Sequence, residues 1–204
     1  MIKVLELFSG TRSIGKCCDA LGWDSVSVDM ILPADHKVDI MDFDYKQYPK
    51  DTFDIVWASP PCTEYSKAKS QGVRDIVGAN KLVIKTLEII NYFNCEYWFM
   101  ENPQTSLLKN QPFMKDLPFV DGDYCMYGLP YRKRTRIWTN KKYNKPPLKL
   151  CDKNCGSFID GRHIGSCGTG GKGQGHTKSY SNKSYSKYEK YRIPEDLIYS
   201  LFLD

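Results

Sequence analysis

The sequence predicts an α/β fold of the Rossmann-like type, with a mostly parallel sheet. Short β-rich runs alternate with helical patterns over residues 1–140, and this alternation is typical of βαβ units. The 204 residues are enough for one well-buried core. The contents of 41% hydrophobic and 26% charged residues exclude wholesale disorder and a collagen-like chain, because both classes depart strongly from these values.

The individual elements follow from local composition and spacing. Five runs have the composition of strands: Lys3–Phe8, Ser25–Asp29, Phe53–Ala58, Tyr97–Met100 and Arg134–Thr139. Apolar residues recur on one face of a predicted helix over Asn80–Phe93, and a shorter helix over Gly15–Leu21 ends at Gly22. The run Ile193–Leu203 opens with a proline suited to a first helical turn, so we expect a final helix that packs on the core.

The composition divides the chain into three segments. Residues 1–142 form the predicted α/β domain. Residues 143–192 form a small irregular insert that is basic and rich in cysteine and glycine. It begins with an extended linker, Tyr143–Leu150, that contains two consecutive prolines, and we expect a mobile loop over Gly165–Lys187. Residues 193–204 carry the final helix.

The N-terminus and the cysteines indicate an intracellular protein. The chain starts without the basic segment and apolar stretch of a secretory signal, and no apolar run reaches the roughly 18 residues of a membrane span. We therefore expect no membrane association. In an intracellular chain of this length, the eight cysteines are expected to be reduced thiols rather than a disulfide framework.

The positive charge is concentrated in the last third of the chain. The net charge is +5, but residues 130–192 carry 16 Lys and Arg against 3 Asp and Glu, a balance of +13. Such an asymmetry favours a polyanion docking on one side of the protein. A solvated, lysine-rich surface is the alternative explanation.

The first predicted strand runs into a tight turn, Phe8-Ser9-Gly10, that is followed by a helix. A strand, a small-residue turn and a helix form a nucleotide-binding corner. Asp29 ends the second strand, where a carboxylate can accept both hydroxyls of a ribose. Asp39 ends the next extended segment, where its carboxylate could accept an adenine amino group while Ile40 covers the ring.

The most informative stretch is a strand that ends in Ser59-Pro60-Pro61-Cys62. Two consecutive prolines make a stiff turn that cannot join the sheet ladder. A cysteine on such a turn projects from the strand end with little conformational freedom, and as a thiolate it is a nucleophile. Taken alone, Cys62 could also be an inert, partly buried thiol.

Four motifs in order resemble the cytosine-C5 DNA methyltransferase family. They span about 135 residues and are Phe8-Ser9-Gly10, Ser59-Pro60-Pro61-Cys62 with Tyr65-Ser66, Phe99-Met100-Glu101-Asn102-Pro103, and Gly128-Leu129-Pro130 with Arg134-Thr135-Arg136-Ile137-Trp138. They are similar to the family's cofactor loop, catalytic Pro-Pro-Cys loop, Glu-Asn-Val motif and arginine strand. The resemblance implies an S-adenosylmethionine-dependent methyltransferase fold in residues 1–142, and a compact member of the family like those of viruses and mobile elements.

The resemblance also implies the roles of the site residues. Cys62 would attack C6 of a cytosine flipped out of DNA, so that C5 can accept a methyl group. Glu101 would hydrogen-bond N3 and the exocyclic amine, Asn102 would fix that loop, and Arg134 and Arg136 would hold the base carbonyl and a phosphate. S-adenosylmethionine is the implied methyl donor. Its expected contacts are Phe8, Ser9, Gly10, Asp29, Asp39, Ile40 and Pro60.

The chain departs from the family pattern at several positions. Ser59, Thr63 and Pro103 replace glycine, glutamine and valine, and Arg132 stands where glutamine opens the arginine strand. There is no Gly-Asn-Ala/Ser-Val motif near the C-terminus, and the target-recognition region is at most the small insert. Two alternatives therefore stay open: an inactive homologue that binds DNA or cofactor as a regulatory subunit, and a cytosine methylase that acts on RNA or nucleotides. Amine methylation is disfavoured, because Cys62 occupies the position of the stacking aromatic residue in amino-methyltransferases.

The insert offers four zinc-type ligands within 17 residues, Cys151, Cys155, His163 and Cys167. Small loops that lack a core often need such a metal clip, so a structural zinc ion is one expectation and a set of reduced cysteines is the other. The lysines and tyrosines that follow, among them Tyr180, Tyr185, Tyr188 and Tyr191, suit phosphate contact and base stacking. A disordered solubilising loop is the alternative there.

Overall fold

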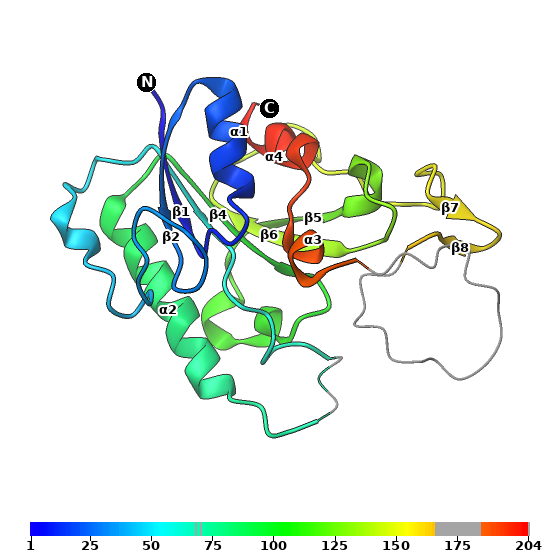
Figure 1. Ribbon diagram of the computed structural model, residues 1–204, viewed down its shortest axis with the longest axis horizontal. Coiled ribbons are helices and arrows are strands. Elements are labelled where there is room, and N and C mark those ends of the chain that lie inside the picture. Colours follow the sequence, from blue (N-terminus) through cyan, green and yellow to red (C-terminus); the bar gives the residue numbers. More distant parts are fainter. Residues whose placement is uncertain (68, 70, 166–184, 204) are drawn as a thin grey trace.

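The computed structural model describes residues 1–67, 69, 71–165 and 185–203. The strands are β1 Lys3–Leu7, β2 Asp24–Val28, β3 Ile55–Ala58, β4 Tyr97–Pro103, β5 Phe119–Asp123, β6 Arg134–Thr139, β7 Phe158–Ile159 and β8 Arg162–His163. The α-helices are α1 Ser13–Leu21, α2 Ile76–Phe93, α3 Lys187–Tyr191 and α4 Glu195–Phe202. The short 3-10 helices are η1 Tyr45–Gln47, η2 Leu107–Asn110, η3 Pro112–Met114 and η4 Tyr124–Tyr127. Figure 1 shows their arrangement.

Six strands form one sheet in the order β2-β1-β3-β4-β6-β5. The pairs β1–β2, β1–β3 and β3–β4 are parallel, whereas β6 runs antiparallel to both of its neighbours. The predicted α/β class with a mostly parallel sheet is thus confirmed. The chain runs from β1 to β2 on one side of β1, and then crosses back from β2 to β3 on its other side. The topological switch point therefore lies between β1 and β3. Ligands of such sheets bind at the carboxyl ends of the strands at this point.

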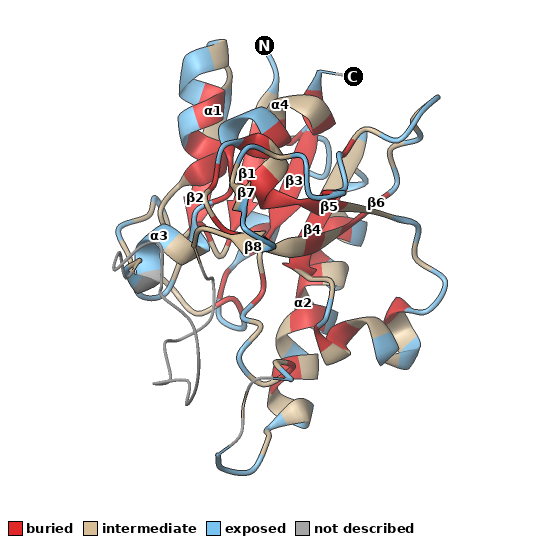
Figure 2. Ribbon diagram, turned by 90° about the vertical axis from the view of Figure 1, so that its right-hand side faces the viewer, coloured by how far each residue is buried: buried red, intermediate tan, exposed pale blue. Residues whose placement is uncertain are grey.

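Helices cover both faces of the sheet and divide the core into two clusters. On one face α2 packs Val83, Ile89 and Phe93 against β1 and β3. On the other face α1 and α4 pack together against the sheet. Figure 2 shows the strands and the inner faces of these helices as buried. Strand β3, Ile55–Ala58, is buried at every position, as expected for a central strand of a parallel sheet.

The predicted final helix is confirmed as α4, and it completes the core. Its Phe202 stacks on Trp23 with ring centroids 5.7 Å apart and lies 5.5 Å from Phe99 of β4. Upstream of α4, the Ile193 N–H donates to Ser13 Oγ at 3.1 Å, which ties the end of the chain to the start of α1. Both termini lie on the same side of the molecule (Figure 1).

Local signals explain where the helices begin and end. The Asp75 carboxylate accepts from the Gly78 N–H at 2.7 Å and caps α2, which starts four residues earlier than predicted. Gly22 ends α1 as predicted, with φ 68° in the left-handed region that glycine adopts at no steric cost. Among the described residues, no helix is both long and apolar enough to cross a lipid bilayer.

The insert is only partly described. The linker Tyr143–Leu150 contains no helix or strand, as predicted. Two very short strands, β7 and β8, form a hairpin that was not predicted. Most of the predicted loop Gly165–Lys187 lies outside the described residues, as does Tyr180. Residues 187–191, expected to be irregular, instead form α3, capped by reciprocal hydrogen bonds between Ser186 and Glu189.

Candidate active site

A cavity of about 380 Å³ opens at the carboxyl ends of β1, β3 and β4. Its walls come from the β1–α1 loop, the segments after β2, the Pro-Pro-Cys turn, the end of β4 and α3. The cavity therefore lies at the switch point of the sheet. Ten of the predicted site residues line it: Phe8, Ser9, Gly10, Asp29, Asp39, Ile40, Pro60, Cys62, Glu101 and Asn102.

The β1–α1 loop has an unusual backbone that a buried carboxylate supports. Phe8 and Gly10 both have positive φ, 56° and 51°, and a bulky residue rarely adopts this conformation. Glu6, at the end of β1, accepts from the N–H groups of Ile14 and Gly15 at 3.1 and 3.0 Å. Burial raises the pKa of Glu6 to about 7, and these two hydrogen bonds oppose that shift. Sequence reasoning missed Glu6, although its place beside Phe8-Ser9-Gly10 was a signal.

Asp29 and Asp39 hold the loops on the far side of the cavity. Asp29 accepts from the Gly10 N–H at 2.8 Å through Oδ2, and from the N–H groups of Ile31 and Leu32 at 2.8 Å through Oδ1. Asp39 accepts from the Met41 N–H at 2.9 Å. Both carboxylates keep lone pairs toward the cavity, since each oxygen can accept two hydrogen bonds.

Apolar side chains that sequence reasoning missed lie beside these carboxylates. Met30 and Ile31 line the cavity, and they are 60% and 69% exposed. Exposed apolar side chains next to acceptor carboxylates suit a ligand with a flat apolar face and polar edges.

Helix α3 and the residue Ile193 form one side of the cavity. Tyr188 and Tyr191 of α3, and Ile193 after it, line the cavity. The Tyr131 hydroxyl donates to the Glu189 carbonyl at 3.1 Å and holds α3 against the residues that precede β6. The lysine- and tyrosine-rich segment thus contributes a wall of the cavity.

The Pro-Pro-Cys turn is fixed from both of its neighbouring strands. The Ser59 N–H donates to the Leu7 carbonyl at 3.2 Å, and the Asn102 side-chain amide donates to the Pro60 carbonyl at 3.0 Å. The Ser59 hydroxyl accepts from the Trp57 indole N–H at 3.0 Å. Serine at position 59 therefore has its own partner in the core. Asn102 joins the end of β4 to the turn that carries Cys62.

Glu101 is a buried carboxylate held at one oxygen. Its Oε1 accepts from the hydroxyls of Thr135 at 2.5 Å and Tyr124 at 3.2 Å, and the Lys133 ammonium lies 3.5 Å from it. Lys133 also lies over the Tyr124 ring, 4.6 Å from its centroid. Among the described residues all three contacts are to Oε1. The other oxygen, Oε2, is thereby available to a ligand.

Cys62 is half-buried beside these charges. Burial raises the pKa of its thiol, and the negative charge of Glu101 raises the pKa further, whereas the Lys133 ammonium lowers it. Lys133 lines the cavity and is the cation that favours the thiolate. Sequence reasoning missed Lys133, because the resemblance pointed to the arginines of the same strand.

Arg134 and Arg136 do not line the cavity. They lie on the opposite face of β6 from Lys133 and Thr135, since successive side chains of a strand alternate. Each pairs with a carboxylate of β5 directly across the sheet: Arg134 with Asp123 at 3.0 Å, and Arg136 with Asp121 at 2.8 Å. The expectation that the two arginines share one face is correct, but the structure does not bring them to Cys62. Strand β5, which supplies their partners, was not predicted.

Three of the four predicted zinc ligands come together away from this cavity. Cys151, Cys155 and His163 cluster with Cys125, a residue that sequence reasoning did not include. The fourth predicted ligand, Cys167, lies outside the described residues.

Two buried polar atoms at the cavity have no hydrogen-bond partner among the described residues. They are the Ser9 hydroxyl and the side-chain carbonyl of Asn102, and both residues line the cavity. A buried polar group without a partner costs free energy unless a ligand or water satisfies it. The cavity therefore fits a ligand with hydrogen-bonding groups on both the β1 side and the β4 side, as S-adenosylmethionine and a pyrimidine base together would provide.

Comparisons with known proteins agree with this geometry. A model of the family "C-5 cytosine-specific DNA methylase" matches residues 29–114. A protein of Frog virus 3 (isolate Goorha), designated "probable DNA (cytosine-5)-methyltransferase", is 31% identical over 221 aligned positions that cover 98% of each chain.

The fold has a counterpart among solved structures. A proposed DNA modification methyltransferase encoded within an E. coli prophage superposes with a TM-score of 0.53 at 14% identity. The match covers 68% of this chain and 46% of that chain, so this chain spans about half of that protein's length. At this identity the likeness extends to the methyltransferase fold only. The 31% identity to the viral relative over 98% of the chain shows that this protein belongs to the C-5 cytosine-specific DNA methylase family.

Proposed function

We propose that this protein transfers a methyl group from S-adenosylmethionine to C5 of cytosine in DNA through a covalent bond between Cys62 and C6 of the base. The observation that carries the proposal is the single cavity in which Cys62, Glu101 and Lys133 meet the predicted cofactor residues. We also propose that it acts inside the cell, on a base flipped out of the duplex.

The cofactor would occupy the β1–β2 side of the cavity. Asp29 would accept the ribose hydroxyls and Asp39 the adenine amino group, while Ile31 and Ile40 cover the ring faces. When bound, S-adenosylmethionine supplies an electrophilic methyl group. The unpaired Ser9 hydroxyl supports this placement, because it supplies a buried donor and acceptor on that side.

Cys62 would act as the nucleophile. Its thiolate adds to C6 of the cytosine, and the electron pair released toward C5 makes that carbon able to accept the methyl group. Water in the cavity then takes the C5 proton; the C5–H electron pair forms the C5–C6 double bond, the C6–S bond breaks, and the thiolate of Cys62 is released as the aromatic ring is restored. The stiff Pro60-Pro61 turn and its hydrogen bond from Asn102 hold the sulfur in place during both steps.

Glu101 and Lys133 would stabilise the charge that develops on the ring. The Oε1 atom of Glu101 is held by Thr135 and Tyr124, so in the protonated acid Oε2 would carry the proton and donate it to N3 of the base, which neutralises the charge that develops there. Lys133 supplies the positive charge that the resemblance assigned to Arg134 and Arg136. A base paired in a duplex cannot reach a half-buried thiol next to a buried carboxylate, so flipping is required.

Covalent trapping tests this proposal directly. A duplex that contains 5-fluorocytosine is incubated with the full chain and S-adenosylmethionine, because fluorine at C5 blocks the elimination that would release Cys62. We expect a denaturation-resistant adduct with the wild type and with Cys95→Ser, which serves as the control because Cys95 is a half-buried cysteine two residues before β4. We expect no adduct with Cys62→Ser.

The same assay separates the alternatives. Tight DNA binding without an adduct, over a panel of sequences, would refute the reaction and select the inactive binding homologue. Adducts with 5-fluorocytosine RNA or the free nucleotide, but none with DNA, would support the attack of Cys62 on the base and refute DNA as the substrate. Bisulfite sequencing of DNA from cells that express the protein then gives the target sequence.

A further inference from the structure

We propose that Cys125, Cys151, Cys155 and His163 bind one Zn²⁺ ion that anchors the insert to the catalytic domain. Cys125 lies in η4, which follows β5, whereas the other three residues belong to the insert. The site is therefore formed by two parts of the chain that are far apart in sequence. This inference concerns the assembly of the fold and is independent of the proposed reaction.

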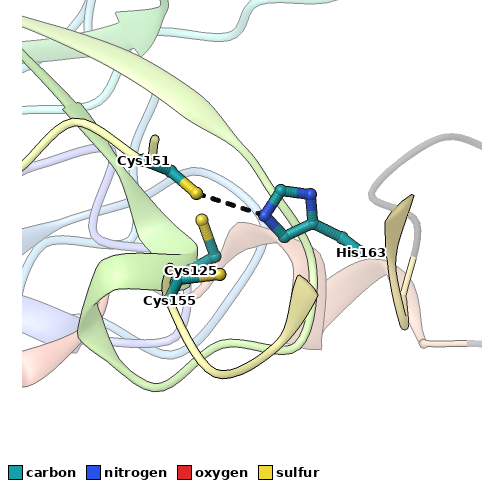
Figure 3. A group of neighbouring side chains, drawn as sticks. All are labelled: Cys125, Cys151, Cys155 and His163. Carbon is teal, nitrogen blue, oxygen red and sulfur yellow. Dashed lines mark hydrogen bonds between the residues drawn. The ribbon is translucent and has the colours of Figure 1, made fainter. Parts of the chain in front are cut away.

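The four ligand atoms have the spacing of a tetrahedral site. All lie within 4.8 Å of one another, and Cys151 Sγ is 3.4 Å from His163 Nε2. A zinc ion with Zn–S near 2.3 Å and Zn–N near 2.0 Å places tetrahedral ligands roughly 3.5–3.8 Å apart. Figure 3 shows the three sulfur atoms and the imidazole nitrogen directed toward a common centre. Three thiolates and one imidazole are a zinc-type donor set.

The surroundings orient these ligands. The Lys153 N–H donates to Cys151 Sγ at 3.3 Å, in a turn where Lys153 itself has φ 80°. The Cys151 N–H donates to the buried Asp123 carboxylate at 2.9 Å. The His163 ring packs edge-on against Phe158, with centroids 5.3 Å apart. Such contacts around the ligands fix their orientation, as in other structural metal sites.

The insert has little else to hold it. Its hairpin consists of two residues in each strand, with Phe158 half-buried and Ile159 46% exposed. A hairpin of this size is not stable without further support. The Cys125 side chain, in contrast, is buried in the catalytic domain. A metal ion bound to both Cys125 and the insert would supply the folding free energy that an apolar core supplies elsewhere.

A disulfide explains the cluster less well. The three cysteines of the cluster are free thiols, and pairing any two of them would leave the third thiol beside His163 without a partner. Zinc binding instead uses every ligand. It releases the thiol protons to solvent and involves no oxidation, so it is compatible with a reducing compartment.

The geometry also changes the ligand set expected from the sequence. Cys125 completes the site in place of Cys167, which lies outside the described residues. Because Cys125 follows Tyr124, whose hydroxyl donates to Glu101, the metal would stabilise a segment that borders the active site.

Metal analysis of the purified full chain tests the proposal. After growth with zinc and gel filtration, we expect one zinc ion per chain for the wild type, Cys95→Ser and Cys167→Ser. We expect less than ~0.1 zinc per chain for Cys125→Ser and Cys155→Ser, because loss of one ligand weakens a structural site severely. Removal of the metal from the wild type with a strong chelator should lower Tm by at least about 5 °C.

Replacement with Co²⁺ keeps the test valid if a variant fails to fold. Cobalt bound to the wild type should show the intense thiolate-to-metal bands and visible absorption of a tetrahedral cysteine site. The proposal would be overturned if the wild type held less than ~0.1 zinc per chain and the thiols of Cys125, Cys151 and Cys155 still reacted with a thiol reagent after zinc was added back. Loss of zinc in Cys167→Ser together with full zinc content in Cys125→Ser would overturn this ligand set. A disulfide between cysteines of the cluster, found by mass spectrometry of the wild type, would overturn the proposal that the cluster binds a metal ion.

Discussion

The buried carboxylate under the cofactor loop makes a quantitative prediction. Burial raises the pKa of Glu6 from 4.5 to about 7, so the folded protein binds a proton there that the unfolded chain releases. Such a group contributes stability that is fully present below the unfolded pKa and is lost as the pH rises through the folded pKa. A shift of 2.5 pKa units corresponds to about 3 kcal/mol. Glu6→Gln removes this contribution.

The difference in unfolding free energy between the wild type and Glu6→Gln isolates this residue. Urea denaturation followed by tryptophan fluorescence, between about pH 4 and pH 8, should show the wild type losing about 3 kcal/mol relative to the variant. Titration of all other groups cancels in the difference. If the unfolding free energies of the wild type and Glu6→Gln changed with pH in parallel, the reasoning would be refuted. A wild type that gains stability with pH would show that the hydrogen bonds from Ile14 and Gly15 outweigh burial.

Three further predictions concern the cavity and the strand beside it. Lys133→Met should move the pH profile of 5-fluorocytosine trapping to higher pH, because the pKa of Cys62 rises without the cation, whereas Lys133→Arg should leave the profile in place. An unchanged profile of Lys133→Met would contradict this. Arg136→Ala should lower the unfolding free energy by about 1–2 kcal/mol through loss of its pair with Asp121, with the trapping rate changed less than about twofold; loss of trapping would restore its predicted catalytic role. Ser9→Ala should weaken S-adenosylmethionine binding about threefold to tenfold in calorimetry, with the unfolding free energy unchanged within about 0.5 kcal/mol, since its hydroxyl has no hydrogen-bond partner in the described part of the chain. Unaltered affinity would place the cofactor elsewhere.

The sequence was sufficient to predict the strands that are buried on both faces of the sheet. Strands β1 and β3 differ from their predicted bounds by one or two residues, because continuous apolar runs mark central strands. Strand β6 has the predicted bounds although its first half alternates between arginine and threonine. Strand β5 was missed because its sequence, Phe-Val-Asp-Gly-Asp, has low strand propensity, and it is stabilised by cross-strand ion pairs with β6. Helix α3 did carry a signal, the Ser186–Glu189 capping box, within a stretch whose composition favoured a loop.

Prediction of the site residues from the sequence was limited by what local sequence can specify. Motif spacing predicted that Cys62 and Glu101 share a site, and both line the cavity, Cys62 on the turn after β3 and Glu101 within the last residues of β4. It could not show which face of β6 meets the cavity, since a shift of one residue reverses every side chain and exchanges Arg134 for Lys133. Cys125 was missed because its partners come from the insert, and only tertiary structure brings them to η4.

The reversed direction of β6 determines when the surroundings of Cys62 are completed during folding. Cys62 and Glu101 come from the carboxyl ends of β3 and β4, but Lys133 reaches the same edge because it precedes a strand that runs the other way. The thiol, the carboxyl group and the ammonium group of the proposed reaction are thus contributed by three separate passes of the chain. A fragment or a nascent polypeptide that lacks the last pass also lacks the Lys133 ammonium, which lowers the pKa of the Cys62 thiol.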